Sequence, residues 1–113
     1  MSEATSSDTK RFRDEHPSGW LVLARHDSVP YIIDALLDAP AHRGFNQSEL
    51  AREAGVSRQS VGRHVDLLVG IGVLEPIENT TPTRYRFNPD SRVSQALVEL
   101  DGAMNAAGAE PEG

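Results

Sequence analysis

The sequence is richest in chemically useful side chains between residues 57 and 63. Arginine can donate two parallel hydrogen bonds to guanine, glutamine can bind adenine in the same way, and serine can bind phosphates or either kind of base. A glycine among them would let the backbone approach a ligand closely. The residues concerned are Ser57, Arg58, Gln59, Ser60, Gly62 and Arg63. We therefore expect this segment to contact double-stranded DNA.

Two short helices joined by a tight turn are predicted to position these side chains. Asn46 can cap the first helix, and Glu49 can reach back to the cap. Gly55 ends that helix, and Ser57 caps a second helix that runs over about residues 57–71. Because a capped helix start presents free amides and a partial positive charge, the second helix can lie in the major groove with its start at a phosphate.

A first helix and a β-hairpin flank this pair. The first helix is predicted to begin at Asp27 or Ser28 and to end at Pro40. Strands are predicted over residues 73–77 and 84–87, with a polar turn between them. On the second strand, Tyr85 and Phe87 are expected to face inward, and Arg84 and Arg86 to point into solvent.

A last helix is predicted to begin at Asn88 or Asp90 and to carry one apolar stripe. The stripe can fold back on the first helix as core, or it can form the seam of a dimer. We prefer a homodimer because one recognition helix reads only a few base pairs, whereas a twofold dimer spans two half-sites. The stripe consists of Val93, Leu97, Leu100 and Met104.

These elements define a mainly α-helical fold with a small β-hairpin, a winged helix-turn-helix with a three-helix core, a wing and a C-terminal helix. Residues 20–104 form the predicted domain. Residues 1–19 and 105–113 lack apolar periodicity and are expected to be flexible. The apolar segment 20–24 can be a helical turn or an extended piece, and the sequence leaves both open.

The stretch from Phe45 to Val65, continued by Leu68 and residues 72–74, resembles the winged helix-turn-helix transcriptional regulators of the MarR and ArsR type. It is most similar to their small haloarchaeal members, and the resemblance covers residues 28–104. It implies DNA contact by the recognition helix and by a wing over about residues 73–87. The contacts it implies are Ser57, Arg58, Gln59, Ser60 and Arg63 from the helix, and Thr80, Thr81 and Arg84 from the wing.

The charge balance is acidic, with 17 Asp and Glu against 11 Lys and Arg and a net charge of −6. Ten of the basic residues are arginine, a usage that suggests a salt-adapted archaeal protein or an acidic domain from a GC-rich bacterium. Net charge governs solubility and non-specific binding rather than fold. Between Ala41 and Val65, four arginines stand against two acids, so the predicted DNA face is locally basic.

Several functions are disfavoured by what the sequence lacks. There is no cysteine, which excludes disulfides, thiolate metal sites and a cysteine nucleophile. The four histidines lack ligand spacing, so we expect no metal and no cofactor, and Glu49 and Glu53 lack a partner for catalysis, so we expect no enzyme. With no apolar run of roughly 20 residues and no signal-peptide pattern, we expect a cytoplasmic protein. A small-molecule effector is left undefined.

One alternative keeps the fold and changes the partner. A winged helix can serve as a protein interaction module, which would place apolar residues where Arg58, Gln59 and Arg63 stand. The polar character of these positions favours DNA over a protein partner.

Overall fold

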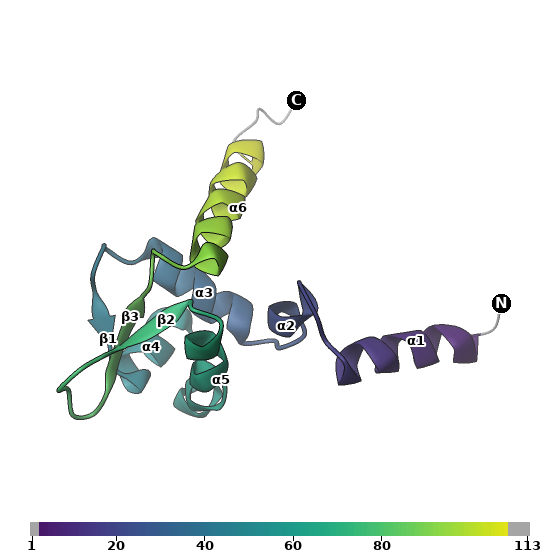
Figure 1. The fold of residues 1–113 in the computed structure, drawn as a ribbon, viewed down its shortest axis with the longest axis horizontal. Coiled ribbons are helices and arrows are strands. Elements are labelled where there is room, and N and C mark those ends of the chain that lie inside the picture. Colours follow the sequence, from purple (N-terminus) through teal and green to yellow (C-terminus); the bar gives the residue numbers. More distant parts are fainter. Residues whose placement is uncertain (1–2, 109–113) are drawn as a thin grey trace.

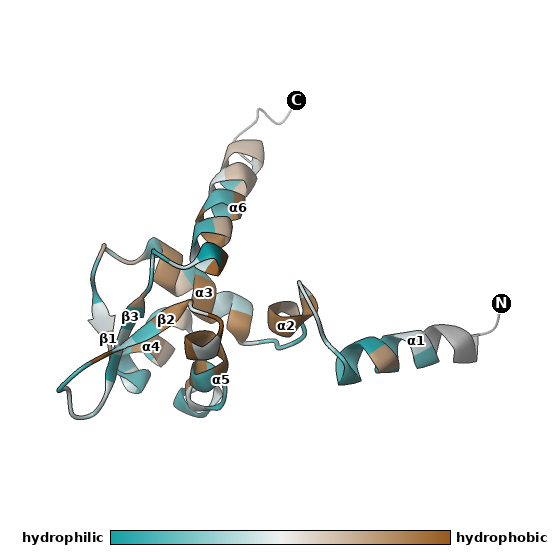
Figure 2. Cartoon of the chain, in the orientation of Figure 1, coloured by the Kyte–Doolittle hydropathy of each residue, from teal (hydrophilic) through white to brown (hydrophobic). Residues whose placement is uncertain are grey.

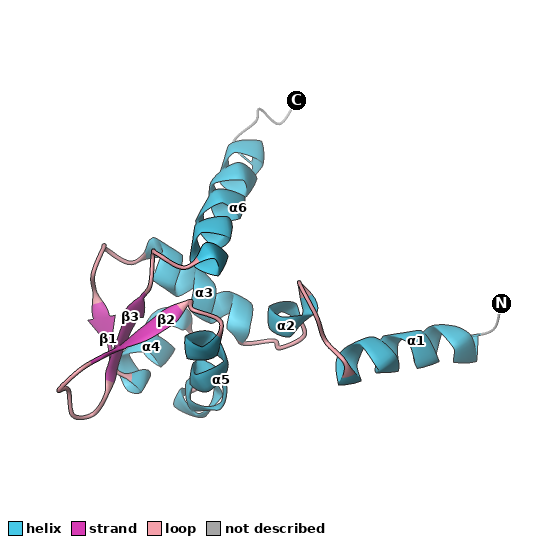
Figure 3. Ribbon diagram, viewed as in Figure 1, coloured by secondary structure: helices cyan, strands magenta, loops and turns pink. Residues whose placement is uncertain are grey.

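The structure, a computed structural model, describes residues 3–108 of the 113-residue chain. The chain is mainly α-helical, with a small antiparallel sheet of three strands and a C-terminal helix (Figure 1 and Figure 3), which confirms the predicted fold class. In chain order the elements are α1 (Glu3–Glu15), α2 (Leu21–Ala24), α3 (Val29–Asp38), β1 (Gly44–Phe45), α4 (Gln47–Ala54), α5 (Arg58–Gly70), β2 (Leu74–Ile77), β3 (Arg84–Phe87) and α6 (Arg92–Gly108).

Helix α3 begins and ends where its sequence signals place it. Ser28 is the N-cap, and Pro30 lies in the first turn, where its missing N–H is not needed. Ala39 has an extended conformation (φ −76°, ψ 151°) because the ring of Pro40 disfavours a helical residue before it. Both predicted ends of this helix are confirmed.

Helices α4 and α5 are joined by a turn of three residues, and each helix starts at a side-chain cap. Asn46 Oδ1 accepts a hydrogen bond from the amide of Glu49 (2.8 Å), and Glu49 Oε1 accepts one from the amide of Asn46 (2.9 Å). Gly55 ends α4 in the left-handed conformation, with φ 74°. Ser57 Oγ accepts a hydrogen bond from the amide of Ser60 (3.0 Å). The predicted caps are confirmed.

One hydrophobic core joins the three central helices to the sheet. Figure 2 shows hydrophobic residues concentrated on α2, α3 and α5, whereas α1 is mostly hydrophilic. Removal of this apolar surface from water is the main force that holds the helices against the sheet. The buried apolar residues are Val29, Ile32, Ile33, Leu36, Phe45, Leu50, Ala51, Val61, Val65, Leu68, Val73 and Leu74.

Strand β3 is central in the sheet, with β1 and β2 antiparallel on its two sides. Strands β2 and β3 form the predicted hairpin. Strand β1 was not predicted: Gly44 pairs with Arg86, and Phe45 pairs with Tyr85. Two residues are too few to give an alternating pattern in the sequence. A Cβ on Gly44 would lie 2.7 Å from Ile77 Cδ1, so a larger residue there would require the end of the Ile77 side chain to move.

The side chains of β3 depart in part from expectation. Tyr85 and Phe87 are half-buried and pack against the core, as predicted. Arg84 and Arg86, however, are also half-buried, and each is held by an acidic side chain. Arg86 Nε donates to Glu75 Oε2 across the hairpin (2.9 Å). The expectation that both guanidinium groups simply point into solvent is therefore wrong.

Helix α6 begins at Arg92, later than the predicted start at Asn88 or Asp90. Asn88 Oδ1 accepts a hydrogen bond from the amide of Asp90 (3.1 Å) and makes a turn instead of a helix start. The cap is Ser91, whose Oγ accepts from the amide of Ser94 (3.0 Å). The side chains of Asn88 and Ser91 can each accept a hydrogen bond from a nearby amide, so the sequence alone does not decide which of the two caps α6.

The apolar stripe of α6 is divided between two environments. Val93 and Leu97 are half-buried and pack against the core. Leu100 and Met104 are 46% and 64% exposed. The alternative in which the stripe folds back as core therefore holds for its first half only, while its second half remains at the surface.

The segment before residue 20 contains a helix where the sequence indicated no regular structure. Lys10 and Asp14, one turn apart on α1, form an ion pair (3.1 Å), and the rings of Phe12 and His16 are in contact. Helix α1 extends away from the body of the protein (Figure 1). For the segment 20–24, the sequence allowed either a helical turn or an extended piece, and the structure has the helical turn α2 there. At the other end, α6 includes residues 105–108, and 109–113 lie outside the described residues.

Candidate nucleic-acid interface

The residues predicted on the third helix share its outer face. Ser57, Arg58, Gln59, Gly62 and Arg63 are exposed, and Ser60 is half-buried. The opposite face of α5 is buried and, apart from His64, apolar. Helix α5 is thus fixed by one face and presents amide, hydroxyl and guanidinium groups on the other.

The start of α5 meets the start of α4 and the hairpin turn at one cleft of about 190 Å³. These three segments are far apart in the sequence, and burial of their apolar neighbours in one core brings them together. The cleft is polar, and two capped helix starts lie at it. Its lining residues are Asn46, Gln47, Ser48, Arg58, Pro82, Thr83 and Tyr85.

Sequence reasoning missed the α4 side of this cleft. Gln47 and Ser48 are the first two residues of α4 after its cap, and the amides at a helix start have no partner within the helix. Such amides favour anions. The capping box at Asn46 was the signal that could have placed Gln47 and Ser48 in the site. On the hairpin, Pro82 and Thr83 line the cleft, whereas the sequence pointed to Thr80, Thr81 and Arg84.

Gly62 has a neighbour that explains its lack of a side chain. A Cβ at this position would lie 3.1 Å from Gln47 Oε1. Glycine therefore leaves room for the Gln47 side chain of α4 on the outer face of α5. This packing is a different reason for glycine from the predicted close approach to DNA, and the two reasons are compatible.

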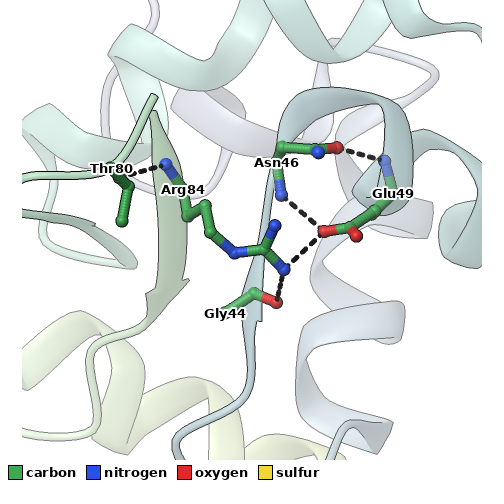
Figure 4. Close-up of polar contacts among 5 residues, drawn as sticks. All are labelled: Gly44, Asn46, Glu49, Thr80 and Arg84. Carbon is green, nitrogen blue, oxygen red and sulfur yellow. Dashed lines mark hydrogen bonds and ion pairs between the residues drawn. The ribbon is translucent and has the colours of Figure 1, made fainter. Parts of the chain in front are cut away.

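Arg84 joins the hairpin to the cap of α4 (Figure 4). Its Nη2 lies 2.7 Å from Glu49 Oε1 and donates to the Gly44 carbonyl at 3.0 Å. The same Glu49 oxygen accepts the hydrogen bond from the Asn46 amide. The guanidinium group is thus engaged by β1 and α4 within the chain. We infer that Arg84 positions the wing rather than serving mainly as a contact itself.

Thr80 is also engaged within the hairpin. Its Oγ1 donates to the Ile77 carbonyl (2.7 Å) and accepts from the Arg84 amide (2.9 Å), as Figure 4 shows in part. Thr80 thus links the end of β2 to the start of β3 across the hairpin turn. Of the predicted wing residues, Thr81 is the exposed one, and it precedes Pro82 at the turn.

The charge of Glu49 is compensated at the site. The hydrogen bond from the Asn46 amide lowers the pKa of Glu49 most, and the positive charges of Arg84 and Arg43 lower it further against the opposing effect of desolvation. Glu49 is therefore ionised and paired, so it adds little repulsion toward a phosphate. Within the described part of the chain, neither Arg58 nor Arg63 takes part in an ion pair.

Two features, a metal-binding cluster and a membrane-spanning helix, are absent from the described part of the chain, residues 3–108. No group of three or more His, Asp or Glu side chains in that range could hold a metal ion. No helix in that range is both long and apolar enough to cross a membrane.

Comparisons of the chain with models of protein families, with curated proteins and with solved structures find no match in any of the three. The class is therefore defined by the fold itself. A mainly α-helical chain carries a small antiparallel sheet and a C-terminal helix, an arrangement compatible with a winged helix. The polar face of α5 and the cleft beside it are the candidate interface of this fold.

Proposed function

We propose that the protein is a sequence-specific regulator of transcription that binds double-stranded DNA, of the MarR- and ArsR-like winged helix-turn-helix type. Helix α5 lies in the major groove, and the β2–β3 hairpin contacts the adjacent backbone or minor groove. The observation that carries the proposal is the exposed face with Arg58, Gln59 and Arg63 beside the start of α4 and the hairpin turn.

The dimensions of α5 suit this role. Its 13 residues give a length of about 20 Å, and a helix fits the major groove, which is about 12 Å wide. Arg58 and Gln59 lie in the first turn, and their side chains suit contacts with base edges, with guanine and adenine as the preferred partners. The capped start at Ser57 supports a phosphate contact.

A protein interaction module is the second candidate, and the character of α5 disfavours it. Such a module needs an apolar centre to its contact surface. The outer face of α5 is instead made of arginine, glutamine, serine and glycine. The large hydrophobic residues that are exposed in the described part of the chain lie elsewhere, on α1, α3 and α6 and at Trp20 just before α2.

The homodimer is part of the proposal and is supported by an apolar groove between α2, α3 and α6. The groove has a volume of about 200 Å³ and a mainly apolar lining, with the two acids Asp34 and Asp101 among its lining residues. Trp20, Leu100 and Met104 line it and are 66%, 46% and 64% exposed. We assign α6 of a second copy as the occupant, because two copies of one recognition helix read a site long enough for specificity.

Binding to selected DNA tests the function. Duplexes enriched from a random pool are titrated in high KCl, with fluorescence anisotropy as the readout. Arg58→Ala with Arg63→Ala should lose at least about tenfold in affinity, because a bidentate base contact contributes about 1–3 kcal/mol. Arg92→Ala, which removes an exposed arginine at the start of α6, is the matched control and should bind normally. Failure of folded wild type to select any duplex would overturn the proposal.

A further inference from the structure

A second polar cleft lies on the side of α5 away from the hairpin. It separates the turn before α3 from the middle of α5 and has a volume of about 510 Å³. The side chains that carry the argument come from both walls. They are Arg25, His26, Asp27 and Ser28 on the turn, and Arg63 and His64 on α5.

The two arginines give this cleft an excess of positive charge. Two guanidinium groups, those of Arg25 and Arg63, line it together with one carboxylate, that of Asp27. Arg25 also contacts a residue outside the cleft: its Nη1 donates a hydrogen bond to the Asp14 carbonyl at 3.2 Å. None of these three side chains forms an ion pair within the described residues, so their charges are not consumed elsewhere.

The two histidines, one from each wall of the cleft, are in contact with each other. The ring centroids of His26 and His64 are 4.6 Å apart, with 46° between the ring planes. His64 is buried, with 8% of its surface exposed. Burial lowers the pKa of His64 most, and the positive charges of His26 and Arg63 lower it further. An anion in the cleft would reverse the electrostatic part of this effect.

The start of α3 adds to the same field. Ser28 is the N-cap of this ten-residue helix, yet its side chain makes no capping hydrogen bond. The positive end of the helix dipole therefore lies beside the two arginines, where it favours negative charge. A hydroxyl group, two guanidinium groups and two imidazoles are donors suited to tetrahedral oxyanions.

We propose that the cleft between the 25–28 turn and helix α5 binds a phosphate group, held by Arg25 and Arg63 and coupled to proton uptake by His64. Arg63 belongs both to this cleft and to the outer face of α5. The phosphate group can therefore belong to the DNA backbone at the flank of the major groove, and this form of the proposal rests on the proposed function. It can also be a free phosphate ion, and this form of the proposal is independent of the proposed function.

The test follows the histidine ring signals of the full chain by NMR. Inorganic phosphate is titrated against chloride at matched ionic strength, and the selected duplex is titrated separately. We expect saturable shifts at His26 and His64 that weaken about tenfold in Arg25→Ala, the size of one charge-assisted hydrogen bond. Arg25→Lys should recover part of the affinity, and Arg92→Ala should leave it unchanged.

The coupling to proton uptake is tested with sulfate, because the charge of sulfate is constant between pH 6 and 8. Saturating sulfate should raise the pKa of His64 in wild type and leave it unchanged in Arg25→Ala. A merely structural role for Arg25 would not produce this difference. Circular dichroism of each variant establishes that it is folded.

The outcomes separate the two proposals. Shifts with free phosphate support the cleft whether or not DNA binds. Shifts with the duplex alone, lost in Arg25→Ala although this variant still binds the selected duplex in the anisotropy assay, support a backbone phosphate. Absence of both kinds of histidine shift, while wild type still binds the selected duplex in the anisotropy assay, overturns the cleft and leaves the proposed function standing. Absence of any response to either ligand overturns both.

Discussion

Arg84 Nη2 on the last strand of the hairpin lies 2.7 Å from Glu49 Oε1 at the start of α4. Through this contact the hairpin is tied to the capping box, and through the box to the helix pair that carries α5. The two side chains are 37% and 33% exposed, so water screens the pair only in part. The position of the β2–β3 hairpin therefore depends on the charge of Glu49, which lies on α4 and not on the hairpin.

We expect Glu49→Gln to weaken binding to the selected DNA, although it removes a negative charge near the interface. Glutamine keeps the capping hydrogen bonds but loses the ion pair, so the hairpin is held less firmly. Arg84→Met should give a similar loss, and the double variant little more, because the two residues act through one contact.

The salt dependence decides between positioning and contact for Arg84. If Arg84 bound a phosphate, Arg84→Met would reduce the slope of log affinity against log salt by about 1, and Glu49→Gln would tighten binding. If it only positions the hairpin, both variants keep the wild-type slope. Anisotropy titrations over a range of KCl concentrations distinguish the two results.

His64 should make stability fall as the solution becomes acidic. Its pKa is lowered in the folded protein from the usual value of 6.5, so the unfolded chain binds more protons between the two values. Stability is therefore full above pH 6.5 and declines as pH falls toward the folded pKa. Urea unfolding at pH 7.5, 6.5 and 5.5 measures the decline.

His64→Gln provides the comparison for this pH effect. Glutamine does not titrate, so the difference in unfolding midpoint between wild type and variant should shrink or change sign at low pH. A constant difference at all three pH values would show that His64 does not titrate differently on folding. Sulfate in the buffer would bind the proposed cleft, so chloride is used.

Gly62→Ala should stabilise the protein and weaken DNA binding. Alanine favours a helix over glycine by about 1 kcal/mol. The added Cβ would lie 3.1 Å from Gln47 Oε1, which is the end of a flexible side chain and can move. Its displacement disturbs the cleft at the start of α4. Thermal unfolding and anisotropy measure the two effects, and a destabilised variant would show that Gln47 is held rigidly.

The dimer is tested on the exposed half of α6. Met104→Glu should convert a dimer to a monomer in sedimentation velocity runs at micromolar concentration, with little change in monomer stability because Met104 is 64% exposed. Val98→Glu is the matched control, since Val98 is 51% exposed on the same helix but does not line the groove with Trp20. A monomeric wild type would contradict the proposed dimer.

The ends of α3 and α4, the start of α5 and the hairpin were predictable from the sequence because their causes are local. A cap such as Asn46 acts on residues three positions away, and Gly55 ends α4 through its own backbone. Strand β3 was recognised by alternation between neighbours. The exposed face of α5 follows from the helical period once Val61 and Val65 are taken as core. These features needed no knowledge of the rest of the chain.

Local ambiguity limited the prediction at both ends of the chain. Asn88 and Ser91 each have a side chain that can cap, and the sequence does not rank them. In the sequence, the apolar residues of α6 recur at one helical spacing along the whole helix. Only the structure shows that α6 packs against the core near its start, where the buried Ser94 donates its Oγ hydrogen bond to the Gly72 carbonyl (3.3 Å). Helix α1 has few apolar residues, so its helical backbone has no hydrophobic signature in the sequence.

The contacts that assemble the candidate sites were decided only by the tertiary structure. Arg84 meets Glu49 across 35 positions of sequence, and His26 meets His64 across 38. Charge and ring type at one position carry no information about which distant partner it will have. That choice is made when the apolar faces of α3, α4 and α5 close on the sheet, because close packing fixes every side chain carried by those elements.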